Sequence, residues 1–238
     1  MSQTLLQLEK IQRAVEYCLL SYDNEFKGEI NSDSTGSDFW IWEFRSVHKE
    51  LYFCVRGSDD LEDWLRNASL LPAHIPRVGF AHGGFKNGAE IIAKLTYGIF
   101  THASKVNYKI VLCGHSYGGA VVQIMQQLLL KNFGISADCI TFGSPRVWCP
   151  FAKVLGYHTR VYADSDPITK LPFLGHLLGV YGHRETESFE IDSKSLLSID
   201  DHSIKNYNEY FKQKVNEKYE QLHDEKFQNP RTRNAYNF

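Results

Sequence analysis

The 238-residue sequence contains no long hydrophobic run, since no stretch approaches the roughly 18–20 apolar residues that a membrane-spanning helix needs. Charged side chains between Glu9 and Glu16 interrupt the N-terminal segment, which argues against the uncharged core of a signal peptide. We therefore expect a soluble, cytoplasmic protein without a transmembrane segment, with export by a route that needs no leader as the alternative.

The sequence also lacks an excess of either sign of charge. The chain has 26 basic and 28 acidic residues and a formal net charge of −2. A nucleic-acid-binding surface needs a clustered excess of basic residues. This balance therefore argues against nucleic acid as the main partner, and the sequence sets no oligomeric state.

Cysteine is limited to isolated positions, and no Cys-x-x-Cys pair occurs. The five cysteines are Cys18, Cys54, Cys113, Cys139 and Cys149. Their odd number and wide spacing favour free thiols in a reducing compartment over a disulfide framework. Cys54, Cys113 and Cys139 lie inside apolar runs, where buried and unreactive thiols are expected.

No repeat, low-complexity tract or linker rich in proline, glycine or serine divides the chain, so we expect one domain over residues 1–238. Apolar residues at helical spacing predict an amphipathic N-terminal helix over about residues 4–21. The residues from about 227 to 238 are polar and are expected to form an extended tail.

Short apolar runs alternate with segments of helical periodicity along the rest of the chain. Strands are predicted at 38–45, 50–56, 108–113, 138–142 and 159–163, and helices at 61–67, 85–103, 120–131 and 204–222. The first two strands form a hairpin, and residues 70–84, with two prolines, are expected to form a loop. Near-continuous apolar strands that alternate with helices predict an α/β fold, with a mainly parallel sheet and helices on both faces.

One motif carries chemistry: residues 114–118 read Gly-His-Ser-Tyr-Gly, a G-x-S-x-G sequence. An apolar strand enters it and a helix leaves it, which places Ser116 on a sharp, strained turn above the sheet. Gly114 and Gly118 are expected to flank the serine because a Cβ there would collide with a neighbouring strand or helix. A glycine-rich turn without chemistry is the alternative. A phosphate-binding loop is disfavoured because no Gly-Lys-Ser/Thr follows.

A serine nucleophile needs an acid and a histidine base, which follow it in chain order in this kind of fold. Asp164 and Asp166 both follow a predicted strand, and Asp166 is preferred because Pro167 stiffens its turn. The downstream histidines are His176, His183, His202 and His223. His202 is preferred because it opens the last amphipathic helix, with His183 as its rival.

The oxyanion intermediate needs two hydrogen-bond donors. The N–H of Tyr117, just after the nucleophile, is the first candidate. The second is expected from a loop after an earlier strand, a place that residues 56–58 fit, although they also fit an ordinary strand exit.

Six ordered motifs give the chain a resemblance to a known family. They are VRGSDDLEDW (55–64), HGGF (82–85), VLCGHSYGGA (111–120), TFGSPRV (141–147), DPITKLP (166–172) and DHSIKNY (201–207). The chain resembles the class 3 lipases, α/β-hydrolases related to fungal triacylglycerol lipases, from about residue 39 to 211. The resemblance implies Ser116 as nucleophile, Asp166 as acid and His202 as base.

The resemblance also implies that Ser58, through its N–H and hydroxyl, and the Tyr117 N–H form the oxyanion hole. It implies a structural role for His183 and no catalytic role for His115. In place of Tyr117 the family often has leucine, a departure that could narrow or polarise the cleft.

A mobile lid is implied just after Ser58, at about residues 59–72, where leucines and a tryptophan alternate with acidic residues. Such an amphipathic segment can cover an apolar cleft in water and contact a lipid surface transiently. A fixed surface helix is the alternative. Residues 171–182 are a candidate acyl groove, with core packing as the alternative. The expected substrate contacts are Trp64, Leu71, Phe173 and Leu177.

Together these features predict a serine hydrolase that cleaves carboxylic esters of lipids, triacylglycerol or partial glycerides, through an acyl-enzyme and without a metal or other cofactor. A phospholipase A1 or a feruloyl-type esterase on the same scaffold is one alternative. A non-catalytic lipid- or partner-binding protein with this fold is the other.

Overall fold

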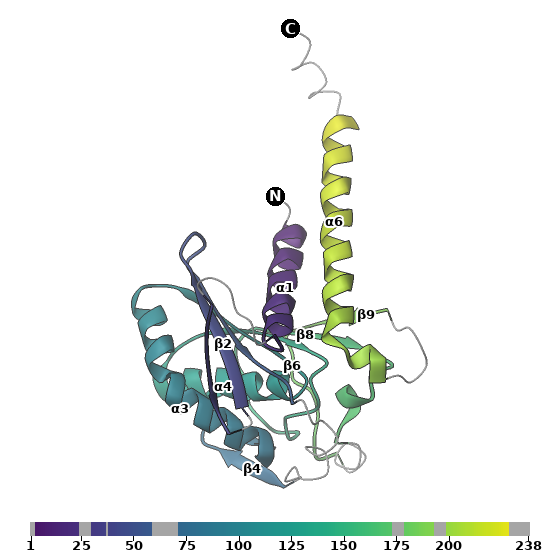
Figure 1. Cartoon of the computed structure of the whole chain (residues 1–238). Coiled ribbons are helices and arrows are strands. Elements are labelled where there is room, and N and C mark those ends of the chain that lie inside the picture. The colour runs from purple at the N-terminus through teal and green to yellow at the C-terminus, as the bar shows by residue number, and fades with distance from the viewer. Residues whose placement is uncertain are drawn as a thin grey trace.

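The computed structural model describes residues 3–23, 30–36, 38–58, 71–172, 179–192 and 199–228. A seven-stranded sheet forms its centre, in the order β1-β2-β3-β6-β7-β8-β9 (Figure 1). The strands are β1 Asn31–Thr35, β2 Asp38–Arg45, β3 Glu50–Val55, β6 Lys109–His115, β7 Asp138–Phe142, β8 His158–Ala163 and β9 Glu187–Ile191.

Strands β3, β6, β7, β8 and β9 run parallel to one another, whereas β1 pairs antiparallel with β2, and β2 antiparallel with β3, at one edge. The predicted mainly parallel sheet and the predicted hairpin of β2 and β3 are therefore confirmed. Because parallel strands point the same way, the carboxyl ends of β3, β6, β7, β8 and β9 all reach the same side of the molecule.

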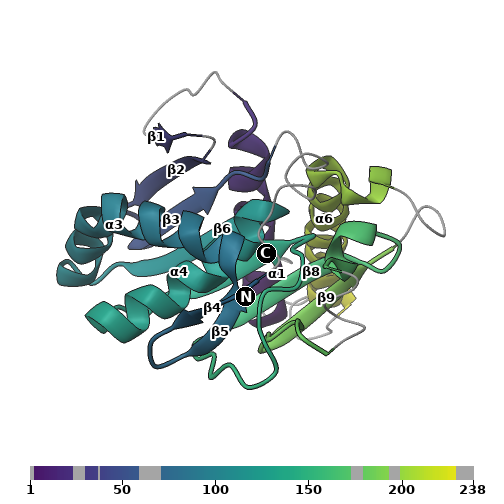
Figure 2. The ribbon, with the colours of Figure 1, turned by 90° about the horizontal axis from the view of Figure 1, so that it is seen from below.

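Four long helices cover the two faces of the sheet (Figure 2). They are α1 Gln3–Leu20, α3 Gly83–Lys105, α4 Tyr117–Phe133 and α6 Ile204–Gln228. Helices α3 and α4 pack on one face, in a core that includes Phe53 and Leu112 of the sheet. Helices α1 and α6 lie side by side on the other face, in a core with Tyr52 and Val111. Neighbouring residues of β3 and β6 thus enter opposite cores, which explains their continuous apolar sequences.

The predicted loop at residues 70–84 is wrong. Residues Pro72–Ile75 form β4 and Gly79–His82 form β5, a separate two-stranded antiparallel sheet (Figure 1). Pro72 stands at the first residue of β4, where a missing N–H is tolerated, and Pro76 lies in the turn. The two prolines therefore mark the start of β4 and the turn that follows it, rather than exclude strands.

Two edge strands of the large sheet were not predicted, β1 and β9. The sequence of β1 is polar and mostly exposed, and in β9 exposed residues alternate with two half-buried ones before the buried Ile191. At the other end, α6 continues to Gln228, close to the expected start of the tail at about residue 227. Residues 229–238 and the predicted helix at 61–67 lie outside the described residues.

Among the residues that the structure describes, no helix is long and apolar enough to cross a membrane.

Candidate active site

The carboxyl ends of the parallel strands bring the predicted site residues to one edge of the sheet. Ser58 lies three residues beyond β3, Ser116 directly follows β6, and Asp166 follows β8. His202 ends a short 3-10 helix (Ile199–His202) after β9. The crevice at this edge is where open α/β folds bind their ligands.

Ser116 sits on a strained turn between β6 and α4. Its backbone angles are φ 55° and ψ −127°, in a region that residues with a side chain rarely adopt. The Ser116 N–H donates to the carbonyl oxygen of Phe142 at 2.9 Å, which ties the turn to the end of β7. The predicted sharp turn at the serine is therefore present.

The glycines on either side of Ser116 allow a close approach between α4 and the sheet. A Cβ at Gly118 would overlap the backbone carbonyl of Val55 in β3, and one at Gly114 would overlap the backbone of Gly118 itself. This matches the expectation that side chains at both positions would collide with neighbouring elements. The first turn of α4 can therefore rest directly on the ends of β3 and β6.

Asp166 is fully buried and its carboxylate is held from three sides. One oxygen, Oδ1, accepts from the N–H of Ile168 at 2.9 Å, in the 3-10 helix Pro167–Lys170 that Asp166 caps. The other, Oδ2, is 2.7 Å from His202 Nδ1 and accepts from the Tyr207 hydroxyl at 3.3 Å. This buried carboxylate is therefore oriented toward the His202 ring.

The alternative acid, Asp164, lies elsewhere. Its side chain is 71% exposed and faces the ammonium of Lys170 at 3.6 Å. Two carboxyl groups that are two residues apart thus have different surroundings, and only that of Asp166 contacts a histidine.

Two buried polar atoms at this edge have no hydrogen-bond partner among the described residues: Ser116 Oγ and His202 Nε2. Because His202 Nδ1 faces a carboxylate, the neutral ring carries its proton there and leaves a lone pair on Nε2. A hydroxyl donor and an imidazole acceptor, both buried and unsatisfied, therefore lie at the same edge of the sheet. Buried groups without partners are rare in folded proteins, and active sites are one place where they persist.

His115 supports the His202 backbone, and both of its own ring nitrogens are occupied by hydrogen bonds. Its Nε2 donates to the His202 carbonyl oxygen at 2.7 Å, and its Nδ1 accepts from the Tyr22 hydroxyl at 2.9 Å. Burial, followed by the nearby His202, lowers the pKa of His115 well below its usual value, so the ring is neutral. The rings of His115 and His202 pack with their centroids 4.6 Å apart.

The other histidine candidates that the structure describes, His183 and His223, have partners other than Asp166. His183 bonds through Nε2 to the carbonyl oxygen of Thr169 at 2.9 Å. Its pKa is lowered to about 3, mainly by burial and then by the charge of Arg160. His223 is exposed on α6, and His176 lies outside the described residues.

The chain segments that carry the two expected oxyanion donors, Ser58 and Tyr117, lie beside Ser116. A Cβ at Gly57 would lie 3.1 Å from Ser116 Cβ, so the chain that leads to Ser58 passes directly beside the nucleophile candidate. The Tyr117 hydroxyl donates to Asp38 Oδ1 at 2.9 Å, which ties the start of α4 to the start of β2. Tyr117 is therefore anchored by a polar contact that leucine could not make.

Three of the four expected substrate contacts lie outside the described residues. Trp64, Phe173 and Leu177 lie outside the described residues, as does the predicted lid from 59 to 70. Leu71 is described and is 74% exposed.

Sequence reasoning missed two supporting residues. Tyr22, just after α1, bonds to His115, and Tyr207, in the first turns of α6, bonds to Asp166. Tyr207 belongs to the DHSIKNY motif, whose aromatic residue was a usable signal. Tyr22 had none, because its partner is 93 residues away.

The chain belongs to the class 3 lipase family, whose model, described as Lipase (class 3), matches residues 52–176. It is similar to secreted mono- and diacylglycerol lipase 1 of Fusarium solani, at 31% identity over 150 residues, covering 59% of this chain and 43% of that one. A chloroplastic phospholipase A1 of Arabidopsis thaliana is 26% identical over 113 residues, covering 43% of this chain and 17% of that protein. The chain thus spans less than half the length of these two relatives.

Solved structures agree on the fold. Lipase II from Rhizopus niveus matches with a TM-score of 0.70 and 17% identity, covering 88% of this chain and 96% of that chain. A lipase from Rhizopus microsporus var. chinensis matches with a TM-score of 0.68 and 15% identity, covering 85% and 86%. The expected α/β-hydrolase fold is therefore confirmed.

The expected cytoplasmic location is wrong by the same comparisons. The relatives from Fusarium solani and Penicillium cyclopium are both named secreted lipases. The prediction rested on the charged residues of the N-terminal segment, but that segment forms α1 and packs on the sheet. Its charges are therefore explained by the fold and say nothing about location.

Proposed function

We propose that this protein is a serine hydrolase that cleaves carboxylic esters of lipids, with Ser116 as nucleophile, His202 as base and Asp166 as acid. The observation that carries the proposal is the buried His202–Asp166 pair, 2.7 Å between Nδ1 and Oδ2, on the same sheet edge as the strained and unpartnered Ser116. Membership of the class 3 lipase family supports the same assignment.

The proposed reaction is acyl transfer to water in two steps. Ser116 Oγ attacks the ester carbonyl carbon while His202 Nε2 takes the hydroxyl proton. Asp166, already bonded to Nδ1, stabilises the imidazolium that forms and keeps the ring oriented. His202 then gives its proton to the leaving alcohol. Water, deprotonated in turn by His202, releases the acyl group from Ser116.

The proposed oxyanion hole consists of the backbone N–H of Tyr117 and the N–H and hydroxyl of Ser58. The closeness of Gly57 to Ser116 supports it, since a Cβ at Gly57 would lie 3.1 Å from Ser116 Cβ and Ser58 is the next residue in the chain. Each donor in such a hole lowers the barrier by about 3–4 kcal/mol. The N-terminus of α4 adds a favourable dipole for the same charge.

Acylglycerols are the proposed substrates, since the Fusarium solani relative is by name a mono- and diacylglycerol lipase. We further propose that residues 59–72 form a lid and that Trp64, Leu71, Phe173 and Leu177 contact the acyl chain. The exposure of Leu71 at the end of this segment supports contact with a lipid surface, because an apolar side chain in water is the part that would gain from it. Phospholipid is the second candidate substrate, because a phospholipase A1 is also similar.

The test compares the purified protein with Ser116→Ala and with a matched serine variant, Ser104→Ala, at an exposed position in the last turn of α3. Emulsified monoacylglycerol, diacylglycerol and triacylglycerol and vesicles of phosphatidylcholine are supplied separately, and released fatty acid is titrated. We expect release from acylglycerols by the parent and by Ser104→Ala, and less than a few per cent of it by Ser116→Ala. Equal release by Ser116→Ala refutes the nucleophile assignment, and release from phosphatidylcholine alone refutes the substrate assignment.

A further inference from the structure

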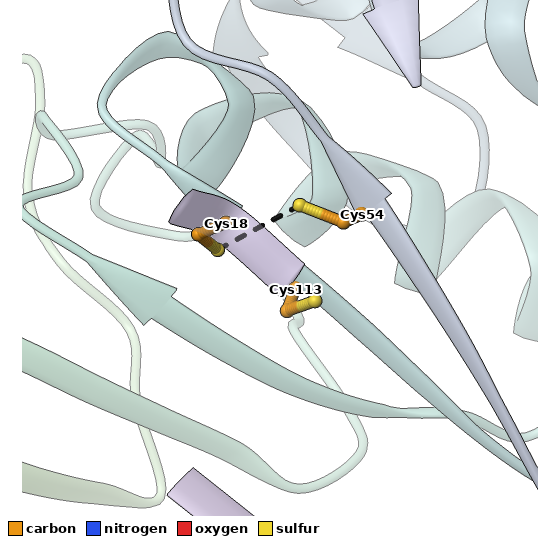
Figure 3. A group of neighbouring side chains, drawn as sticks. All are labelled: Cys18, Cys54 and Cys113. Carbon is orange, nitrogen blue, oxygen red and sulfur yellow. Dashed lines mark hydrogen bonds between the residues drawn. The ribbon is translucent and has the colours of Figure 1, made fainter. Parts of the chain in front are cut away.

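Three cysteine thiols meet inside the core, behind the catalytic edge. Cys18 lies near the end of α1, Cys54 in β3 and Cys113 in β6, and all three are fully buried. Their sulfur atoms lie within 4.8 Å of one another (Figure 3). Cys54 and Cys113 are direct neighbours in the paired strands, and Cys18 reaches them from the helix that covers this face. The trio joins three segments that are far apart in the sequence.

Within the trio, Cys18 and Cys54 are the pair disposed to react. The Cys54 thiol donates a hydrogen bond to the Cys18 sulfur, and the two sulfur atoms are 3.7 Å apart. The Cys113 thiol instead donates to the carbonyl oxygen of Phe53 at 3.7 Å. A disulfide needs the two sulfurs at about 2.05 Å, so closure requires a movement of about 1.7 Å. Cys18 is in the last turn of α1, where a helix yields most easily, whereas Cys54 is fixed in the centre of the sheet.

The surroundings of Cys54 favour its thiolate, the reactive form of cysteine. Burial acts against the charge of a Cys54 thiolate, but the polar side chains of Cys113, Cys18 and Ser21 around it outweigh burial and lower the pKa of Cys54 to about 5. Burial raises the pKa values of Cys18 and Cys113, so these two thiols remain protonated. One nucleophilic sulfur thus faces one thiol at 3.7 Å in an apolar core. A disulfide there would carry no charge, which a dry core favours.

We propose that Cys18 and Cys54 form a redox-active dithiol, which a peroxide converts to an intramolecular disulfide. The Cys54 thiolate attacks one oxygen of hydrogen peroxide, the O–O bond breaks, and Cys54 sulfenic acid and hydroxide form. The Cys18 sulfur then attacks the sulfenic sulfur; the S–S bond forms, the S–O bond breaks, and water leaves with the Cys18 proton. The two sulfurs together lose two electrons and the peroxide gains them. An added dithiol reverses the reaction by exchange.

The disulfide would join α1 covalently to the centre of the sheet. Tyr22, whose hydroxyl bonds to His115, is four residues beyond Cys18, and Gly57, beside Ser116, is three residues beyond Cys54. The bond would thus tether both supports of the catalytic edge. Closing the loop between residues 18 and 54 limits the unfolded chain, and we expect a rise in Tm of about 5–10 °C.

The experiment uses Cys149→Ala as the parent, which removes the partly exposed cysteine and leaves the four buried ones. The folded parent is treated with hydrogen peroxide, then unfolded in an alkylating reagent and digested for mass spectrometry. We expect two thiols to disappear, one peptide pair linked through Cys18 and Cys54, and a Tm that rises and returns after a dithiol is added. Cys139→Ala, a change of an equally buried cysteine outside the trio, should leave all of these results intact.

Three results overturn the proposal. One is a link between Cys54 and Cys113, and another is sulfinic or sulfonic acid without any link. The third is a Cys149→Ala parent that keeps all four thiols at a peroxide concentration that oxidises Cys149 in the unsubstituted protein. In the Cys18→Ala variant, a linked peptide or a peroxide-dependent rise in Tm would also count against it. These readouts do not involve ester hydrolysis, so the dithiol can fail while the proposed function stands, and the reverse.

Discussion

Replacing Asp166 by asparagine is expected to lower kcat for ester hydrolysis by about 10⁴-fold, by analogy with other Ser-His-Asp enzymes. The side chain keeps its shape and loses only its charge and one acceptor. A 10⁴-fold loss corresponds to about 5 kcal/mol of transition-state stabilisation. The hydrogen bonds of the carboxylate explain why an isosteric change should cost so much.

The two oxygens of Asp166 accept from three donors, the N–H of Ile168, the ring of His202 and the hydroxyl of Tyr207. Asparagine has one acceptor oxygen. If that oxygen faces His202, the amide NH₂ meets the N–H of Ile168, and two donors without acceptors in a fully buried site cost about 1–3 kcal/mol. The amide therefore turns its NH₂ toward His202, whose Nδ1 must then accept. The ring proton moves to Nε2, which can no longer take the proton of Ser116.

Asp164→Asn is the matched control, because the same change falls two residues away on an exposed side chain. Initial rates with a soluble p-nitrophenyl ester give kcat, and circular dichroism and thermal unfolding show whether each variant is folded. We expect Asp164→Asn to stay within about twofold of the parent, since exposed ion pairs contribute little. A folded Asp166→Asn that keeps more than a tenth of the parent's kcat, or an equal loss in Asp164→Asn, refutes this reasoning.

Three further predictions concern stability. Gly118→Ala should lower the free energy of unfolding by about 3 kcal/mol, because its Cβ would overlap a β3 carbonyl. Gly98→Ala in α3, which has open space around it, should not lower the free energy of unfolding, and urea denaturation of both variants checks this. Burial lowers the pKa of His158 to about 4, so the unfolded chain binds this proton first, and His158 alone should lower the free energy of unfolding by up to about 1.4 kcal/mol per pH unit between pH 6.5 and 4. His82, His115 and His183, whose pKa values burial also lowers, add to this fall, so a flat stability profile over that range contradicts the prediction. Tyr117→Leu removes the 2.9 Å hydrogen bond to the half-buried Asp38 and should lower the free energy of unfolding by about 1–2 kcal/mol. The value of kcat should stay within about threefold, because the proposed oxyanion donor is the backbone N–H; a roughly 100-fold loss of kcat would show that the side chain acts in the reaction.

The central strands could be predicted because their sequences respond to two buried faces at once. Strand β7 has the predicted bounds, Asp138–Phe142, since an apolar run of that length fits a parallel strand between neighbours. Strand β1, Asn31–Thr35, is polar and largely exposed, and it exists through backbone pairing with β2. A pattern of hydrophobic residues contains no signal for a strand of that kind.

The candidate site divides in a similar way. Ser116 was visible because its turn needs glycines at fixed neighbouring positions, and Asp166 was preferred over Asp164 through an adjacent proline. Burial, which the sequence did not reveal, separates the two aspartates far more sharply than the proline does. The support that Tyr22 gives to His115 joins residues 93 positions apart in the chain, so only the folded structure could reveal it.

The central claim, that Ser116 on the strained turn between β6 and α4 is an activated nucleophile, is tested most directly by labelling with a fluorophosphonate. The purified protein and Ser116→Ala are treated in parallel, with and without detergent, and the adduct is located by mass spectrometry of the digested protein. We predict a phosphonyl group on Ser116 in the parent and none in the variant. A parent that takes up no label in either condition, or one labelled equally in the variant, would contradict it.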